Sequence, residues 1–547
     1  MKIRFGISVR IVLACTVSFV PAASARGQSA EARGGEQLGT VSFPTSCSPA
    51  VQPSFDRAVA LLHSFQYEEA ENAFADVAQN DPQCAMAHWA KAMSLYHQLW
   101  EHPGAEALKK GRDELKQAEA LHAKTARERE YIGAAAAFFQ ESDKLDYHDR
   151  AVAYSKAMEQ LHSHFPEDGE AAAFYALSLI ALPGDDSDLT NRKKAIAILN
   201  QLLLTEPNHP GVAHYLIHAA DTPSLAEQGL AAARRYAKIA PSSAHALHMP
   251  SHIFTRLGLW QESIESNLAS AAVAEKMTAA HLEGASYQMH AMDFLNYAYL
   301  QSGQVAKALA VTEQLKAVPG ADEDHLAYSE AELTARDALE LHHWKEAASL
   351  AVPSAAHWPA GAKISTYWAR AIGAARNGDI SAAREALENL KQAHAESRAK
   401  SEHYSMHSGP AVDQLEAEAW LALTQGKVDE AVKTLGDAAD REDKNGVDLL
   451  TMSAREMLGD MLLELKKPAP ALAEYEVALK EAPNRFDGLY GAARAAELSG
   501  ASAKAKSYYA KLEEICAHAG TERPELQQAH TFLAQTAKEA AKMETGN

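Results

Sequence analysis

The chain alternates short helix-forming stretches with brief turns, and this pattern predicts pairs of helices along most of its length. A clear example is AREMLGDMLLELKKPAPALAEYEVALKEAP, residues 454–483. Small residues stand at Gly459, Ala471 and Ala478, and the stretch closes on Pro483. Small side chains at such places let two helix axes approach closely, and a proline ends the second helix. One pair cannot bury its apolar face alone, so we predict that successive pairs stack on one another.

The same spacing of small residues recurs elsewhere in the chain. It is found in FDRAVALLHSFQYEEAENAFADVAQNDP, in YWARAIGAARNGDISAAREAL and in EAEAWLALTQGKVDEAVKTL. On these stretches the chain resembles the tetratricopeptide-repeat (TPR) superfamily, whose 34-residue unit is a helix-turn-helix. The resemblance implies an all-α fold, a right-handed α-solenoid of about ten to twelve helical hairpins. It further implies a scaffold that binds a protein or peptide partner in a concave groove, and it implies no particular activity.

Composition agrees with a helical protein and narrows the class of partner. Ala, Glu, Leu and Lys are abundant, whereas Gly and Pro number only 29 and 21 among 547 residues. The formal net charge is -20 at pH 7, and no basic stripe is present to neutralise phosphates. We therefore expect no nucleic-acid partner.

The N-terminus has the layout of a cleaved secretory signal. Lys2, Arg4 and Arg10 precede an apolar run, and the small residues ASA follow at positions 23–25. The stretches HYLIHAAD and RRYAKIAPSSAHALHMPSHIFTRLGLW also resemble a group of exported bacterial TPR proteins. We expect a periplasmic or secreted protein with no membrane span after signal cleavage. In that oxidising compartment a disulfide between Cys47 and Cys84 is expected.

No long linker divides the mature chain, and repeat positions set the predicted boundaries. We expect a signal peptide over residues 1–25, an N-terminal arm over 26–50, and TPR-like hairpins over 51–210, 211–318 and 319–547. The central set of hairpins carries most of the candidate chemistry.

Histidines recur in register with the repeat in the central hairpins. His214 and His248 are 34 residues apart, and so are His218 and His252. These positions face the inner groove in the superfamily that the chain resembles. Three successive first helices together place eight candidate metal ligands on one patch: His214, His218, Asp221, His245, His248, His252, His290 and Asp293.

The clustered imidazoles support two interpretations. Two His four residues apart on one helix face can hold an ion, and neutral imidazole binds Zn, Cu, Ni or Fe, with Asp as a further ligand or as a hydrogen-bond acceptor behind a ligand. Alternatively, the patch is a hydrogen-bonded pocket that grips a peptide or a small anion, with protonated His as a pH-sensitive element.

Familiar catalytic motifs are absent from the sequence. There is no H-E-x-x-H, no Walker-type loop, no G-x-S-x-G, no C-x-x-C and no dinucleotide-binding G-x-G-x-x-G. An enzyme of a familiar type is therefore disfavoured. The alternative function that stays open is a metalloenzyme or a metal-handling accessory protein that uses the cluster of His214, His218, His248 and His252.

Pro250 interrupts the helix that carries three of these histidines. Proline lacks the N–H that would bond to the Ala246 carbonyl, so the helix must kink or start late near Met249. The simpler alternative is that Pro250 occupies the first turn of a helix that begins there.

Further candidates concern a partner rather than a metal. On the inner side of an early repeat and of a later one, the partner-binding candidates are Trp89, Met93, Tyr96, His97, Glu332 and Arg336. Packing is the more ordinary role for the aromatic residues, and Glu332 with Arg336 suggests a salt bridge or a clamp on a ligand. His403 and His407, four residues apart, form a weaker candidate site for a bound ion.

Overall fold

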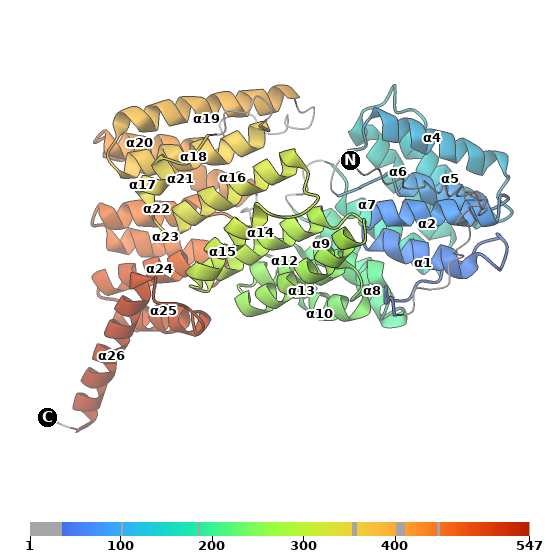
Figure 1. The fold of residues 1–547 in the computed structure, drawn as a ribbon. Coiled ribbons are helices and arrows are strands. Elements are labelled where there is room, and N and C mark those ends of the chain that lie inside the picture. Colours follow the sequence, from blue (N-terminus) through green and yellow to red (C-terminus); the bar gives the residue numbers. More distant parts are fainter. Residues whose placement is uncertain are drawn as a thin grey trace, which may run out of the picture. The chain divides into compact units, whose positions relative to one another are not determined.

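A computed structural model describes residues 35–99, 102–183, 186, 188–352, 358–400, 411–445 and 449–545. The expected signal peptide and the pair His403 and His407 lie outside these residues. Within the described ranges every regular element is a helix (Figure 1). No helix among them is both long enough and apolar enough to cross a bilayer.

The first part of the chain forms eight helices: α1 (Gln52–His63), α2 (Tyr67–Asn80), α3 (Ala85–Met93), α4 (Ala105–Ala120), α5 (Ala126–Phe139), α6 (Tyr147–His164), α7 (Gly169–Ile180) and α8 (Thr190–Thr205). The central helices are α9 (Pro210–Ala220), α10 (Ala226–Ile239), α11 (Ala244–His248), α12 (Pro250–Arg256), α13 (Trp260–Ala279), α14 (Ala285–Gln301) and α15 (Val305–Leu315). The remaining helices are α16 (Glu323–Glu340), α17 (Trp344–Ala348), α18 (Ala360–Arg376), α19 (Ile380–Lys400), α20 (Val412–Thr424), α21 (Val428–Asn445), α22 (Ala454–Glu464), α23 (Pro468–Glu481), α24 (Phe486–Leu498), α25 (Ser502–Ile515) and α26 (Pro524–Thr545).

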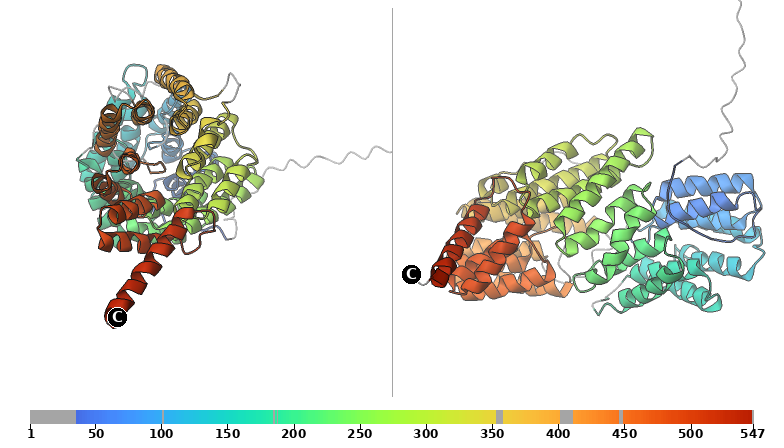
Figure 2. Two further views of the ribbon diagram at one scale, coloured as in Figure 1. Left: turned by 90° about the vertical axis from the view of Figure 1, so that its left-hand side faces the viewer. Right: turned by 90° about the horizontal axis from the view of Figure 1, so that it is seen from below.

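Consecutive helices pack as pairs, and neighbouring pairs stack along the chain (Figures 1 and 2). The pairs run from α1 with α2 to α24 with α25; α11 and α12 together pack on α13, and α26 follows the last pair. The predicted helical solenoid of TPR-like hairpins is therefore confirmed. Its stacking follows from apolar faces that no single pair can bury alone.

Glycines bring the helices of one repeat close together at the predicted places. A Cβ at Gly459 in α22 would lie 2.7 Å from the Tyr475 ring in α23, and one at Gly491 in α24 would lie closer still. Tyr475 belongs to α23, and its fully buried ring fits between α22 and α24 because neither of these two helices carries a side chain there. This is the physical basis of the small-residue pattern in the sequence.

Contacts also join repeats that are far apart in the sequence. The Trp260 indole N–H donates to the Asn484 carbonyl at 2.8 Å, and the Phe486 amide donates to the Gln301 side chain at 2.9 Å. Helix α24 accordingly packs against α14. The C-terminal repeats thus support the central ones directly, whereas a simple solenoid has contacts only between neighbours.

The described part of the N-terminal arm is tied to the repeats. The Thr40 amide donates to the Asn208 carbonyl at 2.9 Å, and the Ser46 hydroxyl donates to Glu128 at 2.7 Å. Cys47 in the arm and Cys84 before α3 are joined by a disulfide. The arm is therefore attached to the first hairpins both covalently and through hydrogen bonds.

The helix that carries His245, His248 and His252 is broken where the proline stands. Helix α11 ends at His248, Met249 follows with φ -52° and ψ -35°, and Pro250 is the first residue of α12. The two interpretations of Pro250 therefore describe one arrangement, in which a helix ends and the next begins within one residue. The break separates His252 from the two histidines before it.

Candidate metal centre

Six histidines gather in the central repeats and divide into two groups of three. Cluster A consists of His214, His218 and His245, and cluster B consists of His248, His252 and His290. In each cluster the three histidines offer ring nitrogens that lie within 4.8 Å of one another. The helices that carry them, α9, α11, α12 and α14, are neighbours in the fold (Figure 1).

Cluster A is centred on His214. Its Nε2 atom lies 3.0 Å from Nε2 of His218, one turn along α9, and 3.0 Å from Nε2 of His245 in α11. The spacing of four residues places His214 and His218 on one helix face, and the next repeat supplies the third ring. Three Nε2 atoms therefore converge at one place.

Cluster B repeats this arrangement 34 residues later. Nε2 of His248 lies 3.0 Å from Nε2 of His252, and the ring of His290 in α14 has its centroid 4.4 Å from that of His248. Again one repeat supplies two rings and the following repeat supplies the third. The register seen in the sequence therefore produces two similar triads.

Hydrogen bonds on the far side of three rings determine which nitrogen carries the proton. Nδ1 of His214 lies 2.7 Å from the His63 carbonyl, and Nδ1 of His252 lies 2.8 Å from the Asp221 carboxylate. Both partners only accept, so each Nδ1 must carry a hydrogen. Burial lowers the pKa of His214, so Nε2 of this neutral ring is a lone pair directed into cluster A.

The same holds for His248. Its Nδ1 atom lies 2.7 Å from Oδ1 of Asn267, whose amide nitrogen donates to the Ser263 carbonyl at 2.8 Å. Oδ1 of Asn267 is therefore the acceptor, and Nδ1 of His248 the donor. Consequently Nε2 of His248 directs a lone pair at Nε2 of His252 across 3.0 Å.

Burial favours the neutral form of four of these rings. Desolvation, together with the neighbouring imidazoles, holds the pKa values of His245 and His248 well below the usual value. Burial likewise lowers the pKa of His214 to about 3 and that of His218 well below its ordinary value. These rings are therefore neutral, which is the form of imidazole that binds metal ions.

One phenylalanine packs against each cluster. Phe65, in the turn between α1 and α2 with φ 55°, has its centroid 4.4 Å from His214 and stacks on His218 and His245. Phe294 in α14 lies with its centroid 4.7 Å from His248 and 4.6 Å from His252. His218 and His252 are partly exposed and His290 is exposed. The clusters are thus covered by apolar rings on one side and reachable from solvent on another.

The two predicted carboxylate ligands have other roles. Asp221 accepts from His252 and from Nε of Arg256 at 2.9 Å; although burial acts to raise its pKa, these two partners keep it well below its usual value. Asp293 accepts from Arg336 at 2.7 Å. Neither is one of the three ligands of a cluster. Asp221 takes the second of the two predicted roles, an acceptor behind a ligand, and orients His252.

Most residues predicted to contact a partner are packed in the core. Trp89, Met93 and Tyr96 are each 2% exposed, and Trp89 packs on Phe43 with ring centroids 5.3 Å apart. His97 is partly buried and stacks on Tyr67. Since these side chains already contact the protein's own residues, the prediction that they form a partner surface is corrected.

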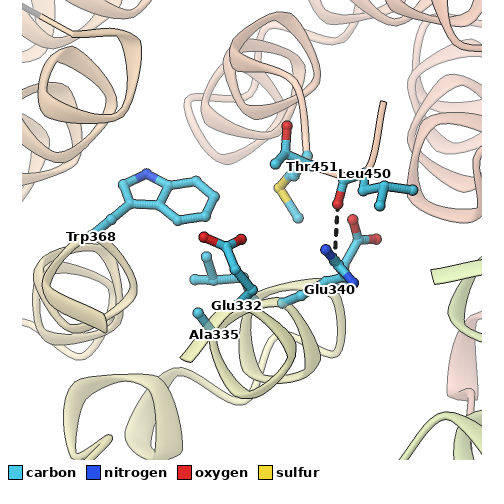
Figure 3. Close-up of a pocket in the computed structure, with 9 residues that line it drawn as sticks. Glu332, Ala335, Glu340, Trp368, Leu450 and Thr451 are labelled. Carbon is cyan, nitrogen blue, oxygen red and sulfur yellow. Dashed lines mark hydrogen bonds between the residues drawn. The ribbon is translucent and has the colours of Figure 1, made fainter. Parts of the chain in front are cut away.

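Glu332 and Arg336 line a small pocket. Arg336 donates to Asp293 and to the Leu450 carbonyl, and Glu332 accepts from the Ser365 hydroxyl. Figure 3 shows Glu332 and Trp368 facing this pocket. Each side chain thus has a hydrogen-bond partner on another segment, and a joint clamp on a ligand stays a prediction.

A third group of titratable residues lies next to cluster A and is fully buried. His63 and His209 bind opposite oxygens of Glu170 through their Nε2 atoms, at 2.7 and 3.1 Å. The Val212 amide donates to Nδ1 of His209, so Nε2 of His209 carries the proton and cannot bind a metal ion. This group is a buried ion-pair cluster, and it holds the end of α1 where the His63 carbonyl meets His214.

Four residues that complete the site have no signal in the sequence pattern. They are His63, Phe65, Asn267 and Phe294, which orient the histidine rings or pack on them. His63 and Phe65 come from the first repeat, about 150 residues before His214. The 34-residue register predicts the histidine pairs, but none of these four contacts follows from it.

Comparison with known proteins agrees with the repeat pattern. A family model described as tetratricopeptide repeat matches residues 55–110 and 416–486, and no curated protein matches the chain. Among solved structures, a human IFIT1 dimer with PPP-AAAA has 13% identity and a TM-score of 0.37, covering 84% of this chain and 95% of that chain. A tetratricopeptide repeat protein from Parabacteroides merdae has 15% identity and a TM-score of 0.29, covering 54% and 99%. The Cut9-Hcn1 hetero-tetramer of APC/C has 14% identity and a TM-score of 0.30, covering 87% and 89%.

Residues 55–110 and 416–486 thus match the tetratricopeptide-repeat family, and the helices between and beyond them pack in pairs of the same kind.

Proposed function

We propose that this protein is an exported tetratricopeptide-repeat scaffold that holds transition-metal ions in clusters A and B. The observation that carries the proposal is the convergence of three imidazole nitrogens in each cluster, within 4.8 Å of one another, while Nδ1 of His214, His248 and His252 is engaged elsewhere.

The donor set indicates the class of metal. Each cluster offers three imidazole nitrogens, which suit Zn, Cu, Ni or Fe better than Mg or Ca. Three protein ligands leave at least one coordination position open, as in catalytic rather than structural sites. This open position favours the second candidate function, a metalloenzyme or a metal-handling accessory protein, over storage in a closed site.

The alternative of a peptide-gripping pocket is less consistent with the geometry. A pocket that binds a peptide would direct its polar atoms toward the ligand, whereas the Nε2 atoms here point at one another. We retain a protein or peptide partner for the repeat scaffold as a whole, because tetratricopeptide repeats are typical of interaction scaffolds. Export to the periplasm or secretion is supported by the layout of residues 1–25 and is consistent with the disulfide between Cys47 and Cys84.

Metal analysis of the full mature chain, purified without a histidine tag, tests the proposal. We expect about two transition-metal ions per chain, one for each group of three ligands. The double variant His214→Ala, His248→Ala removes one ligand from each cluster and should lose both ions. The control variant His164→Ala, His530→Ala changes two exposed histidines and should keep them. Substoichiometric metal in the unaltered protein, even after incubation with each of the four metals, would contradict the proposal.

Asp221→Asn is expected to weaken metal binding at cluster B by about 10- to 100-fold, because the carboxylate that orients His252 and raises its basicity is replaced by a neutral amide. Titration of the metal-free protein with Zn would measure both sites, and cluster A should keep its affinity. Asp437→Asn is the control, since Asp437 pairs with Lys433 at the surface and should leave both affinities unchanged. Equal weakening in the two variants would show that Asp221 has only a structural role.

A further inference from the structure

We infer that clusters A and B form one dinuclear centre, in which two metal ions share a small bridging anion taken from solvent. This inference depends on the proposed function, because it requires that both clusters hold metal. It adds that the ions act together and that the class of ligand is a small anion.

The nearest rings of the two clusters lie about as close to each other as the widest-spaced pair of rings within each cluster. Between clusters, ring centroids lie 6.1 Å apart for His245 and His248 and 6.3 Å apart for His218 and His252. Within clusters, His218 and His245 are 6.4 Å apart, and His252 and His290 are 6.1 Å apart. The six rings therefore form one continuous group.

The chain connectivity explains this continuity. His245 and His248 belong to opposite clusters although they are one turn apart on α11. His218 and His252 occupy equivalent places in successive repeats and face each other from α9 and α12. Stacking of the repeats thus brings the two triads side by side, without a layer of other side chains between these ring pairs.

Charge balance calls for an anion between the ions. The six ligands are neutral imidazoles, so two divalent ions would bring four positive charges into a largely buried site. The nearby carboxylates do not offset them: Asp221 is paired with Arg256, and Asp293 with Arg336. Two dications a few ångströms apart repel strongly at low dielectric, and a shared anion offsets that repulsion.

An anion can reach the site from solvent. His218 and His252 are partly exposed and His290 is exposed, whereas Phe65 and Phe294 cover other parts of the clusters. Each triad leaves coordination positions free, and an anion that occupies one position on each ion satisfies both. A small anion such as azide therefore serves as a probe.

Copper provides a direct readout, because two Cu(II) ions joined through a bridging ligand couple their spins whereas isolated ions do not. The tag-free mature chain is loaded with two equivalents of Cu(II), and bound copper is compared with the integrated electron paramagnetic resonance signal. We expect two coppers per chain with a signal far below two spins, and one azide bound for every two coppers in an optical titration.

A single exposed ligand supplies the matched variant. His290→Ala removes one ring of cluster B at an exposed position, so the fold should be retained, and cluster A keeps all its ligands. We expect this variant to bind copper at cluster A with one full spin per tightly bound copper.

The outcomes separate the two proposals. Two coppers with two full spins would overturn the dinuclear centre and leave the proposed function standing. Failure of the unaltered protein to bind copper, zinc, nickel or iron would overturn both. A His290→Ala variant that still holds two spin-coupled coppers would overturn the assignment of cluster B to this centre.

Discussion

Removal of bound metal is expected to lower the free energy of unfolding by about 4 kcal/mol for each ion, and by about 8 kcal/mol for both, when free metal stands at 1,000 times the dissociation constant. The reason is linkage, since the clusters exist only in the folded chain. Their ligands lie on α9, α11, α12 and α14, so each ion ties successive repeats together. Urea unfolding of the metal-loaded protein, with and without a chelator, measures the difference.

The loss of stability on metal removal should be concentrated in the central repeats, because repeat proteins lose stability locally. Hydrogen exchange should therefore rise most in residues 210–301 when metal is removed. The variant His214→Ala, His248→Ala should give the same unfolding curve with and without chelator. Identical curves for the unaltered protein would show that no metal is linked to its folding.

Arg485→Ala is expected to destabilise the protein by about 3–5 kcal/mol, because it leaves two buried carboxylates without their cation. Arg485 donates to Glu340 at 2.8 Å and to Glu456 at 3.0 Å, and all three side chains are almost fully buried. It also donates to the Thr451 carbonyl at 2.9 Å and to the Tyr297 hydroxyl. Chemical denaturation followed by circular dichroism measures the change.

Part of the destabilisation expected in Arg485→Ala is electrostatic. Burial raises the pKa of Glu456 to about 7, even though Arg485 acts to lower it. Without Arg485 the two carboxylates would face each other unpaired in the core. Lys433→Ala is a suitable control, since Lys433 and its partner Asp437 are both exposed and their pair should contribute at most about 0.5 kcal/mol. A loss below 1 kcal/mol in Arg485→Ala would mean that the carboxylates find other partners.

The helical solenoid and the two histidine pairs could be predicted from sequence because they depend on local spacing. Gly459, Ala471 and Ala478 stand at repeat positions since neighbouring helices need small residues at their contacts. His214 with His218, and His248 with His252, share helix faces because residues four apart always do. The structure places both pairs as this rule requires, with Nε2 atoms 3.0 Å apart in each.

The same sequence could not show which aromatic residues are exposed. Trp89 and Tyr96 occupy inner positions of an early repeat, yet they are buried against the arm and against α5, respectively. Likewise Arg336 pairs with Asp293, 43 residues away. Exposure and ion pairing depend on which distant segments cover a helix, and local spacing carries no information on that.

The sequence by itself predicts the fold and one patch of eight candidate metal ligands. Only the tertiary structure divided that patch into two triads, assigned His245 to the triad of the preceding repeat and moved Asp221 behind His252. It also brought the His63 carbonyl and the Asn267 amide to the rings, which decides where their protons lie. The physical reason is that helix periodicity sets which side chains share a face, whereas the proton on a ring is set by partners that folding brings from other repeats.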